Sequence, residues 1–453
     1  MSFVPATNEQ RLEMLRACSA ASIGELFADI PKTLAPPAPH SGFFGTEGAS
    51  EFEALTICER LASENNARIV SFLGGGFYDH FIPAAVDAVA SRSEFYTAYT
   101  PYQPELSQGT LQAIYEYQSQ ICRLTGMEIS NASLYDGGTA IFEACKMAMS
   151  STSRRKVIVD CGVNPTYRKM LKTHTAAISV DIAEVPLWQD GGLDRQRLSG
   201  VIDDGVAAVV LQNPNFFGVI DDHSDIVDKC KSVGAIAIQS VYPLALPLIK
   251  SPAEQGFDIA VGEGQPLGLP LSFGGPYLGF IGAKKQLARK MPGRIVARTA
   301  DAEGRDGFVL SLQAREQHIR REKATSNICS NEALCALRAH AYLSLLGKNG
   351  LIDVANLCRN KAAYLRECVK KSIPSIKITD RPIFNEFTMA LPISADDCVK
   401  AMAERGFAAG IPVGRYYGGD SDNVLLAAVT EKRTKAEIDC YVGNLREAVG
   451  VKR

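Results

Sequence analysis

Short apolar runs alternate with amphipathic segments through the middle of the chain. The runs have the length and near-continuous hydrophobicity of buried strands, and the segments between them have helical spacing. The predicted strands are Lys156–Asp160, Ile178–Val185, Val206–Leu211, Ala235–Ile238 and Asp258–Val261. The predicted helices are Tyr167–His174, Arg195–Ile202 and Asp225–Ser232. Strand–helix repetition with strands that are apolar on both faces predicts a parallel sheet covered by helices on both sides.

The pattern changes towards both ends of the chain. Near the start, Thr7–Gln10 and Ser22–Glu25 have the spacing of capping boxes that begin short helices. After about residue 330 a long helix leads to two further predicted strands, Asn385–Leu391 and Val424–Val429, and to a terminal helix, Lys435–Ala448. We therefore predict an α/β protein with an N-terminal helical arm (1–60), a large parallel-sheet lobe (61–330) and a small C-terminal α/β lobe (331–453).

Composition excludes several function classes. A formal net charge of −2 over 453 residues argues against a nucleic-acid binder. No apolar run is long enough to cross a bilayer, and the first residues do not resemble a secretory signal. The 12 cysteines include no CxxC pair, which favours a reducing, cytoplasmic location. The six histidines show no metal-binding spacing, so we expect no metal.

Polar and glycine-rich residues follow the predicted strands, where ligands collect in open parallel sheets. These segments are Cys161–Asn164, Gln212–Asn215, Gln239–Ser240 and Gly262–Gln265. Turns favour the same residue types, so any single segment is also explained as a turn. The glycine triplet Gly74–Gly76 lacks dinucleotide-binding spacing, and we assign no nicotinamide site to it.

A second candidate is the start of the helix that follows Tyr135. Asp136, Gly137, Gly138 and Thr139 would place free N–H groups and small residues at the helix N-terminus, which suits a phosphate group. The same residues also suit a simple N-cap by Asp136 or Thr139. The sequence leaves both interpretations open.

The densest polar-aromatic segment, Phe95–Thr110, precedes an amphipathic helix. Tyrosines combine a ring with a hydroxyl and therefore suit the walls of pockets or interfaces. This segment begins the motif YTAYTPYQPELSQGTLQAIYEYQ, which closely resembles the glycine cleavage system P proteins. NASLYDGGTAIFEA (131–144), PLSFGGPYLGF (270–280) and REQHIRREKATSNICS (315–330) are similar to the same family, in the same order.

The resemblance implies fold type I of the pyridoxal-phosphate enzymes. In the family, P proteins occur as one long chain with two homologous halves or as two separate chains, and these motifs match the first subunit of the two-chain form. The implied activity is glycine dehydrogenase (decarboxylating). Glycine is decarboxylated with the help of pyridoxal phosphate, and the aminomethyl group passes to the lipoyl arm of the H protein. The implied assembly contains two copies of each chain.

Two groups that this chemistry needs are missing. The cofactor-bearing half of the family has a lysine shortly before a glycine-rich stretch that ends in Gly-Gly-Pro, and counting back from Pro276 puts Gln265 at that position. No lysine occurs between Lys250 and Lys284, and a glutamine amide cannot form a Schiff base. The expected acid for the pyridine nitrogen falls near Gln239 or Ser240. Lys284 and Lys285 lie in a cationic stretch that reads as an exposed helix.

We therefore expect pyridoxal phosphate on a lysine-bearing second subunit, with this chain supplying the opposite wall of that subunit's site. The expected wall residues are Tyr96, Tyr99, Thr100, Gln103 and Glu105, with Thr325, Ser326 and Asn327 as second choices. Each of them would equally suit plain interface packing.

Two alternative functions remain open. In the first, the chain is a scaffold that only stabilises the partner. In the second, it is an independent pyridoxal-phosphate enzyme. The cationic residues Arg289, Lys290, Arg294 and Arg298 could meet an acidic lipoyl carrier, although a plain solvated surface explains them as well.

Overall fold

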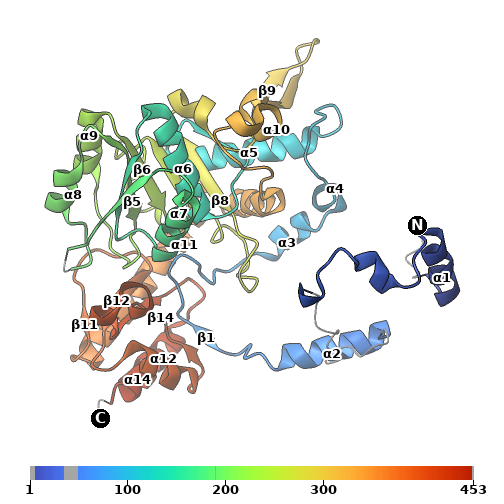
Figure 1. Cartoon of the computed structure of the whole chain (residues 1–453). Coiled ribbons are helices and arrows are strands. Elements are labelled where there is room, and N and C mark those ends of the chain that lie inside the picture. The colour runs from blue at the N-terminus through green and yellow to red at the C-terminus, as the bar shows by residue number, and fades with distance from the viewer. Residues whose placement is uncertain (1–5, 35–48, 189, 451–453) are drawn as a thin grey trace. The chain divides into compact units, whose positions relative to one another are not determined.

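The computed structural model describes residues 6–34, 49–188 and 190–450 (Figure 1). The chain forms two compact units, Met1–Ala67 and Arg68–Arg453. The predicted lobe boundaries at residues 60 and 330 stay predictions. Within the described residues, no helix combines the length and the hydropathy of a membrane span.

The first unit consists of short helices with regular caps. Thr7 and Gln10 form the predicted capping box at the start of α1 (Asn8–Ala17). The Ser22 side chain accepts from the Glu25 N–H, but the helix there is a 3-10 turn, η1 (Ile23–Phe27). A further 3-10 turn, η2 (Lys32–Leu34), and helix α2 (Glu51–Ser63) complete the described part of this unit.

The second unit contains a seven-stranded sheet in the order β2-β8-β7-β6-β5-β3-β4. The strands are β2 (Ile129–Ser130), β3 (Lys156–Asp160), β4 (Asp181–Val185), β5 (Val206–Asn213), β6 (Ile236–Val241), β7 (Ile259–Glu263) and β8 (Gly279–Ala283). The five predicted strands, β3 to β7, are present and mutually parallel. Strand β8 runs antiparallel to β7 because the segment between them contains no crossover helix.

Both faces of this sheet are covered, as the pattern predicts (Figure 1). On β5, Ala208 and Val210 pack with residues of α6 (Gly137–Thr152) and α7 (Pro165–Thr175). The alternate residues Val209 and Leu211 pack with α8 (Arg195–Val201) and α9 (Ser224–Val233). The inner strands β3, β5, β6 and β7 therefore bury both of their side-chain rows, which explains their continuous apolar sequences, whereas the edge strand β4 is only partly buried.

A long helix, α11 (Ala333–Ser372), leads to the second large sheet and is interrupted at Gly347, whose φ is 57°. The second sheet is antiparallel with the order β11-β12-β15-β14. Its elements are β11 (Lys377–Ile378), β12 (Glu386–Ala390), β14 (Ile411–Pro412), β15 (Val424–Ala428), α12 (Ala395–Ala403) and α14 (Lys435–Ala448). The predicted terminal helix is confirmed over its full range.

Shorter elements connect these layers. They are β1 (Val70–Ser71) with its partner β13 (Phe407–Ala408), α3 (Ala84–Ala90), α4 (Ser93–Tyr96), α5 (Gln108–Thr125), η3 (Pro243–Ala245), η4 (Lys285–Lys290), the hairpin β9 (Ile295–Ala300) and β10 (Asp306–Ser311), η5 (Gln313–Arg315), α10 (Gln317–Arg320), η6 (Arg321–Lys323), α13 (Gly414–Tyr417) and η7 (Gly419–Ser421).

Candidate functional site

The carboxyl ends of the parallel strands meet the glycine triplet that precedes Tyr78. Asn164, after β3, donates from Nδ2 to the Gly75 carbonyl at 2.8 Å, and its N–H donates to Gln212 Oε1 at 2.9 Å. Gly74 approaches the small sheet so closely that a Cβ would lie 2.6 Å from Glu386 Oε2. The triplet therefore passes directly beneath the strand ends, where a larger residue at 74 would not fit.

Gln265, at the position expected for the lysine, is buried and its amide is fully used. Its Oε1 accepts from the Tyr78 N–H at 2.9 Å. Its Nε2 donates to the carbonyls of Tyr78 at 3.0 Å and Leu269 at 2.8 Å. The residue is 1% exposed. Gln265 therefore links the segment after β7 to the loop around Tyr78. Both polar atoms of its amide have hydrogen-bond partners within the protein.

Tyr78 extends this network into the small sheet. Its hydroxyl donates to Glu386 Oε1 at 2.5 Å, and the Gly75 N–H donates to Glu386 Oε2 at 3.0 Å. Burial raises the pKa of Glu386 to about 7, although both hydrogen bonds work in the opposite direction. A buried chain of hydrogen bonds thus runs from the end of β7 to β12.

The start of α6 is capped in the way the sequence allows. Asp136 accepts from the Thr139 N–H at 2.8 Å and from the Thr139 hydroxyl at 2.9 Å. The Gly137 N–H donates to Glu263 Oε2 at 3.0 Å. Burial raises the pKa of Glu263 to about 8. The N-cap interpretation is confirmed. The Gly137 N–H at the start of the helix is also bonded within the protein, to the Glu263 side chain.

Gln239 and Ser240 lie within β6, and both are buried. Gln239 Nε2 lies 3.4 Å from His223 Nδ1, and its Oε1 has no hydrogen-bond partner. Burial lowers the pKa of His223 to about 4, so the ring is neutral near pH 7. Neither residue beside the sheet supplies the negative charge that a protonated pyridine nitrogen needs.

These residues do not fit pyridoxal phosphate. The position expected for the amine holds the committed amide of Gln265, and the position expected for the acid holds neutral groups. The Gly137 N–H, at the helix N-terminus that would suit the phosphate, already donates to Glu263 Oε2.

The expected wall residues lie elsewhere on the large lobe. Tyr96, Tyr99, Gln103 and Glu105 are exposed, with Tyr99 85% exposed, and Thr100 is half-buried. Asn327 is exposed, Thr325 is half-buried and Ser326 is buried. The neighbouring Tyr102 ring links the two groups, because its centroid lies 6.0 Å from that of His318 in the second motif. The structure thus brings the first and last motifs together on one surface, apart from Gln265.

One interpretation of cationic residues needs correction. Arg294 is not on a solvated surface: it is buried and hydrogen-bonded to Tyr102 at 3.3 Å and Asn331 at 3.2 Å. The stretch after Lys284 is helical with Lys285 and Arg289 exposed, although as a 3-10 helix, η4, and Lys284 Nζ itself pairs with Asp258 at 2.6 Å. Periodicity does not reveal an ion pair with a residue on another strand.

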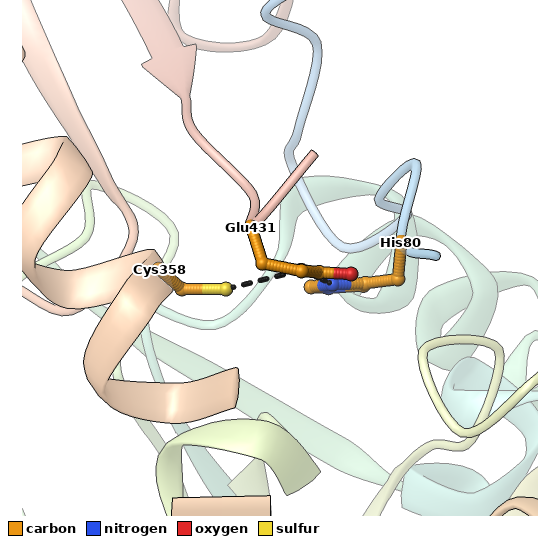
Figure 2. A group of neighbouring side chains, drawn as sticks. All are labelled: His80, Cys358 and Glu431. Carbon is orange, nitrogen blue, oxygen red and sulfur yellow. Dashed lines mark hydrogen bonds and ion pairs between the residues drawn. The ribbon is translucent and has the colours of Figure 1, made fainter. Parts of the chain in front are cut away.

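A second buried cluster joins three distant segments (Figure 2). Glu431 Oε2 lies 2.7 Å from His80 Nδ1 and accepts from the Cys358 thiol at 3.3 Å. Glu431 Oε1 accepts from the Phe81 N–H at 2.6 Å, and His80 Nε2 is hydrogen-bonded to the Tyr242 hydroxyl. Although these side chains are of metal-binding types, they already satisfy one another. We interpret the cluster as a structural contact that stabilises the packing of the loop around residue 80 against α11 and the segment after β15.

Sequence reasoning placed Glu263 in one of the polar strand-end segments, Gly262–Gln265, but missed Tyr78, Glu386 and Tyr167 as members of the strand-end cluster. The signal that could have found the loop before Tyr78 is Gly74–Gly76, since a glycine triplet indicates a close backbone approach as well as a possible phosphate site. No comparable signal marks Glu386, which resembles an ordinary strand residue in the sequence.

Comparison with known proteins gives a consistent picture. Residues 1–445 match the family model described as glycine cleavage system P-protein. The chain is 52% identical to a probable glycine dehydrogenase (decarboxylating) subunit 1 of Nitratidesulfovibrio vulgaris (strain DSM 19637 / Miyazaki F), over 99% of each chain. It is 51% identical to the protein of the same description from Geotalea uraniireducens (strain Rf4), over 99% of this chain and 100% of the relative.

Solved structures agree with this assignment. A crystal structure of glycine decarboxylase (P-protein) of the glycine cleavage system, in inhibitor-bound form, matches with a TM-score of 0.86 and 42% identity, covering 99% of this chain and 100% of that one. A sphingosine-1-phosphate lyase from Burkholderia pseudomallei matches with a TM-score of 0.66 at 14% identity, covering 91% of this chain and 94% of that one. The predicted fold type I of the pyridoxal-phosphate enzymes is confirmed.

Replacement of Glu386 by glutamine should change how stability depends on pH. Because the folded pKa of about 7 lies above the ordinary value of 4.5, Glu386 contributes stability that is fully present below pH 4.5 and is lost as the pH rises through 7. Relative to Glu386→Gln, the wild type should lose ~3 kcal/mol of unfolding free energy across that window. Urea unfolding at a series of pH values measures this. The exposed control Glu404→Gln should follow the wild type, and parallel curves for Glu386→Gln would contradict the assignment.

Glu431→Ala should lower the unfolding free energy by ~3 kcal/mol, since it leaves the buried His80 without its carboxylate partner. Thermal or urea unfolding compares it with Glu447→Ala, an exposed residue at the end of α14. Treatment of the wild type with a metal chelator should leave its melting temperature unchanged. A lower melting temperature after chelation would instead indicate a metal ion held by His80, Cys358 and Glu431.

Proposed function

The chain belongs to the glycine cleavage system P-protein family and is a subunit of a glycine-decarboxylating enzyme, and we propose that it carries no coenzyme of its own. In this proposal a homologous, lysine-bearing second subunit holds pyridoxal phosphate, and the present chain completes that subunit's site. The name "subunit 1" of the relatives supports the existence of a second chain.

One observation carries the proposal: the group at the expected Schiff-base position is the amide of Gln265, with both of its polar atoms bonded to backbone groups. A carboxamide nitrogen is not nucleophilic enough to replace an amine. Lys284, the first lysine after this position, is held in an ion pair with Asp258. Neither Gln265 nor Lys284 thus offers a free amine to bind the coenzyme covalently.

The exposed surface around α4 and α5 supports a role in completing another chain's site. Tyr96, Tyr99 and Leu106 are between 57% and 85% exposed, and tyrosine is enriched where two chains meet. Glu105 and Gln103 place polar groups among them. A homologous partner covering this surface would bury the tyrosine rings. Gln103 and Glu105 of the present chain would then lie at the edge of the partner's coenzyme site.

The wider assembly follows from the same proposal. The pair decarboxylates glycine and passes the aminomethyl group to the lipoyl arm of the H protein, and we propose two copies of each chain per assembly. All 12 cysteines are unpaired in the structure, which supports a reducing compartment, the cytoplasm.

The central test compares each chain alone with the co-expressed pair in glycine–bicarbonate exchange. We expect exchange only from the pair, because neither chain alone has both the coenzyme and the opposite wall. Borohydride reduction should trap pyridoxal phosphate on the second subunit only. A reduced adduct on any lysine of the present chain would overturn the proposal and favour an independent enzyme.

Tyr99→Ala and Glu105→Gln should each lower turnover of the assembled pair by about tenfold or more, equivalent to ~1.4 kcal/mol of transition-state stabilisation. The matched controls are Tyr416→Ala, an exposed tyrosine on α13, and Glu404→Gln. Gel filtration checks that assembly is intact. Unchanged turnover in an intact complex would favour the scaffold alternative.

A further inference from the structure

Three backbone N–H groups from separate segments converge on the carboxyl group of Glu263. Gly137, at the start of α6, donates to Oε2 at 3.0 Å. Gln265 and Leu278 donate to Oε1 at 2.9 and 3.1 Å. The residue is 5% exposed. One of these donors is at the N-terminus of a 16-residue helix, and three convergent N–H groups can hold the oxygen atoms of a carboxyl or phosphate group.

A fourth donor points to the same place and has nothing to bind. The hydroxyl of Tyr167 lies 2.9 Å from where a Cβ on Gly137 would be, and Tyr167 is 5% exposed. This hydroxyl has no hydrogen-bond partner. A buried hydroxyl without a partner is costly, so its presence beside the helix start indicates a place suited to more acceptor atoms than one carboxyl group provides.

Burial and the neighbouring Asp136 both oppose an anion beside the start of α6. Asp136 lies next to it, capping the same helix, and raises the pKa of Glu263 further after the larger effect of burial. A phosphate monoester carries a charge of about −1.5 to −2 at pH 7. A phosphate group would therefore have to displace the Glu263 side chain and also face the Asp136 carboxylate.

We propose that Glu263 is a built-in substitute for a phosphate group: it occupies a phosphate-binding site of this chain and so excludes phosphate-bearing ligands from it. The inference rests on the proposed function, in which the coenzyme belongs to the partner chain. It adds a physical reason for that distribution. The N–H groups of this chain that would hold the phosphate of a non-covalently bound coenzyme are already bonded to Glu263. The coenzyme therefore binds to the second subunit.

Glu263→Ala tests the proposal in the assembled pair, with the partner loaded with coenzyme. The variant keeps Gly137, Gln265 and Leu278 N–H groups and the Tyr167 hydroxyl but removes the carboxyl group. Equilibrium dialysis with labelled inorganic phosphate should show one added site per copy of this chain, with a Kd at least about tenfold below any binding by the wild type. Adding Asp136→Asn, which keeps an N-cap residue, should tighten it further.

The control is Glu143→Ala, which removes another buried carboxyl group farther along α6 and should create no phosphate site. A folded Glu263→Ala pair that binds no more phosphate than this control overturns the inference. If the variant does not fold in chloride, it is refolded in phosphate at equal ionic strength. Recovery only in phosphate supports the inference, and recovery in neither overturns it.

The same experiment separates this inference from the proposed function. If the wild-type chain itself takes up phosphate or coenzyme at this site, the proposed function fails together with the inference. If the wild type binds neither and Glu263→Ala also binds neither, only the role of Glu263 is wrong, and the coenzyme's place on the partner is unaffected.

Discussion

The carboxyl end of the seven-stranded sheet buries an unusual number of polar side chains, and each of them needs a hydrogen-bond partner. A buried amide or carboxyl group without partners costs several kcal/mol in stability. The loop that contains Gly74–Gly76 and Tyr78 supplies partners to three of them: its backbone bonds Gln265 and Asn164, and its backbone and the Tyr78 hydroxyl bond Glu386. The large and small sheets are consequently joined through a continuous hydrogen-bonded layer.

This layer supports the proposal that the chain, although it has the fold of the pyridoxal-phosphate enzymes, holds no coenzyme of its own. At the position expected for the amine there is the amide of Gln265. At the helix N-terminus expected for the phosphate, the Gly137 N–H is bonded to the carboxyl group of Glu263. Both replacements form hydrogen bonds that stabilise the chain. In this proposal the second unit retains the fold of its family, its polar groups at the strand ends bond to one another, and the exposed tyrosines around α4 and α5 serve another chain.

The site was predicted unevenly from the sequence. The spacing from Gln265 to Pro276 was enough to predict that no Schiff-base lysine exists, because covalent chemistry depends on residue type alone. The role of Gln265 as a link to Tyr78 could not be predicted, since the two residues are 187 positions apart. Arg294 and Lys284 were placed at the surface by their charge, but Tyr102, Asn331 and Asp258 bind them inside the fold or at its edge.

The sequence by itself determined the layered α/β fold, because strands buried on both faces must be apolar throughout and the helices beside them must repeat with helical spacing. It also shows that no lysine lies between Lys250 and Lys284, on which the prediction of a missing amine rests. Only the tertiary structure decided which polar groups meet at the strand ends, including the contact of Gly75 with Glu386 across 311 positions. Hydrogen bonds depend on positions within a few tenths of an ångström, and local patterns along a chain do not contain that information.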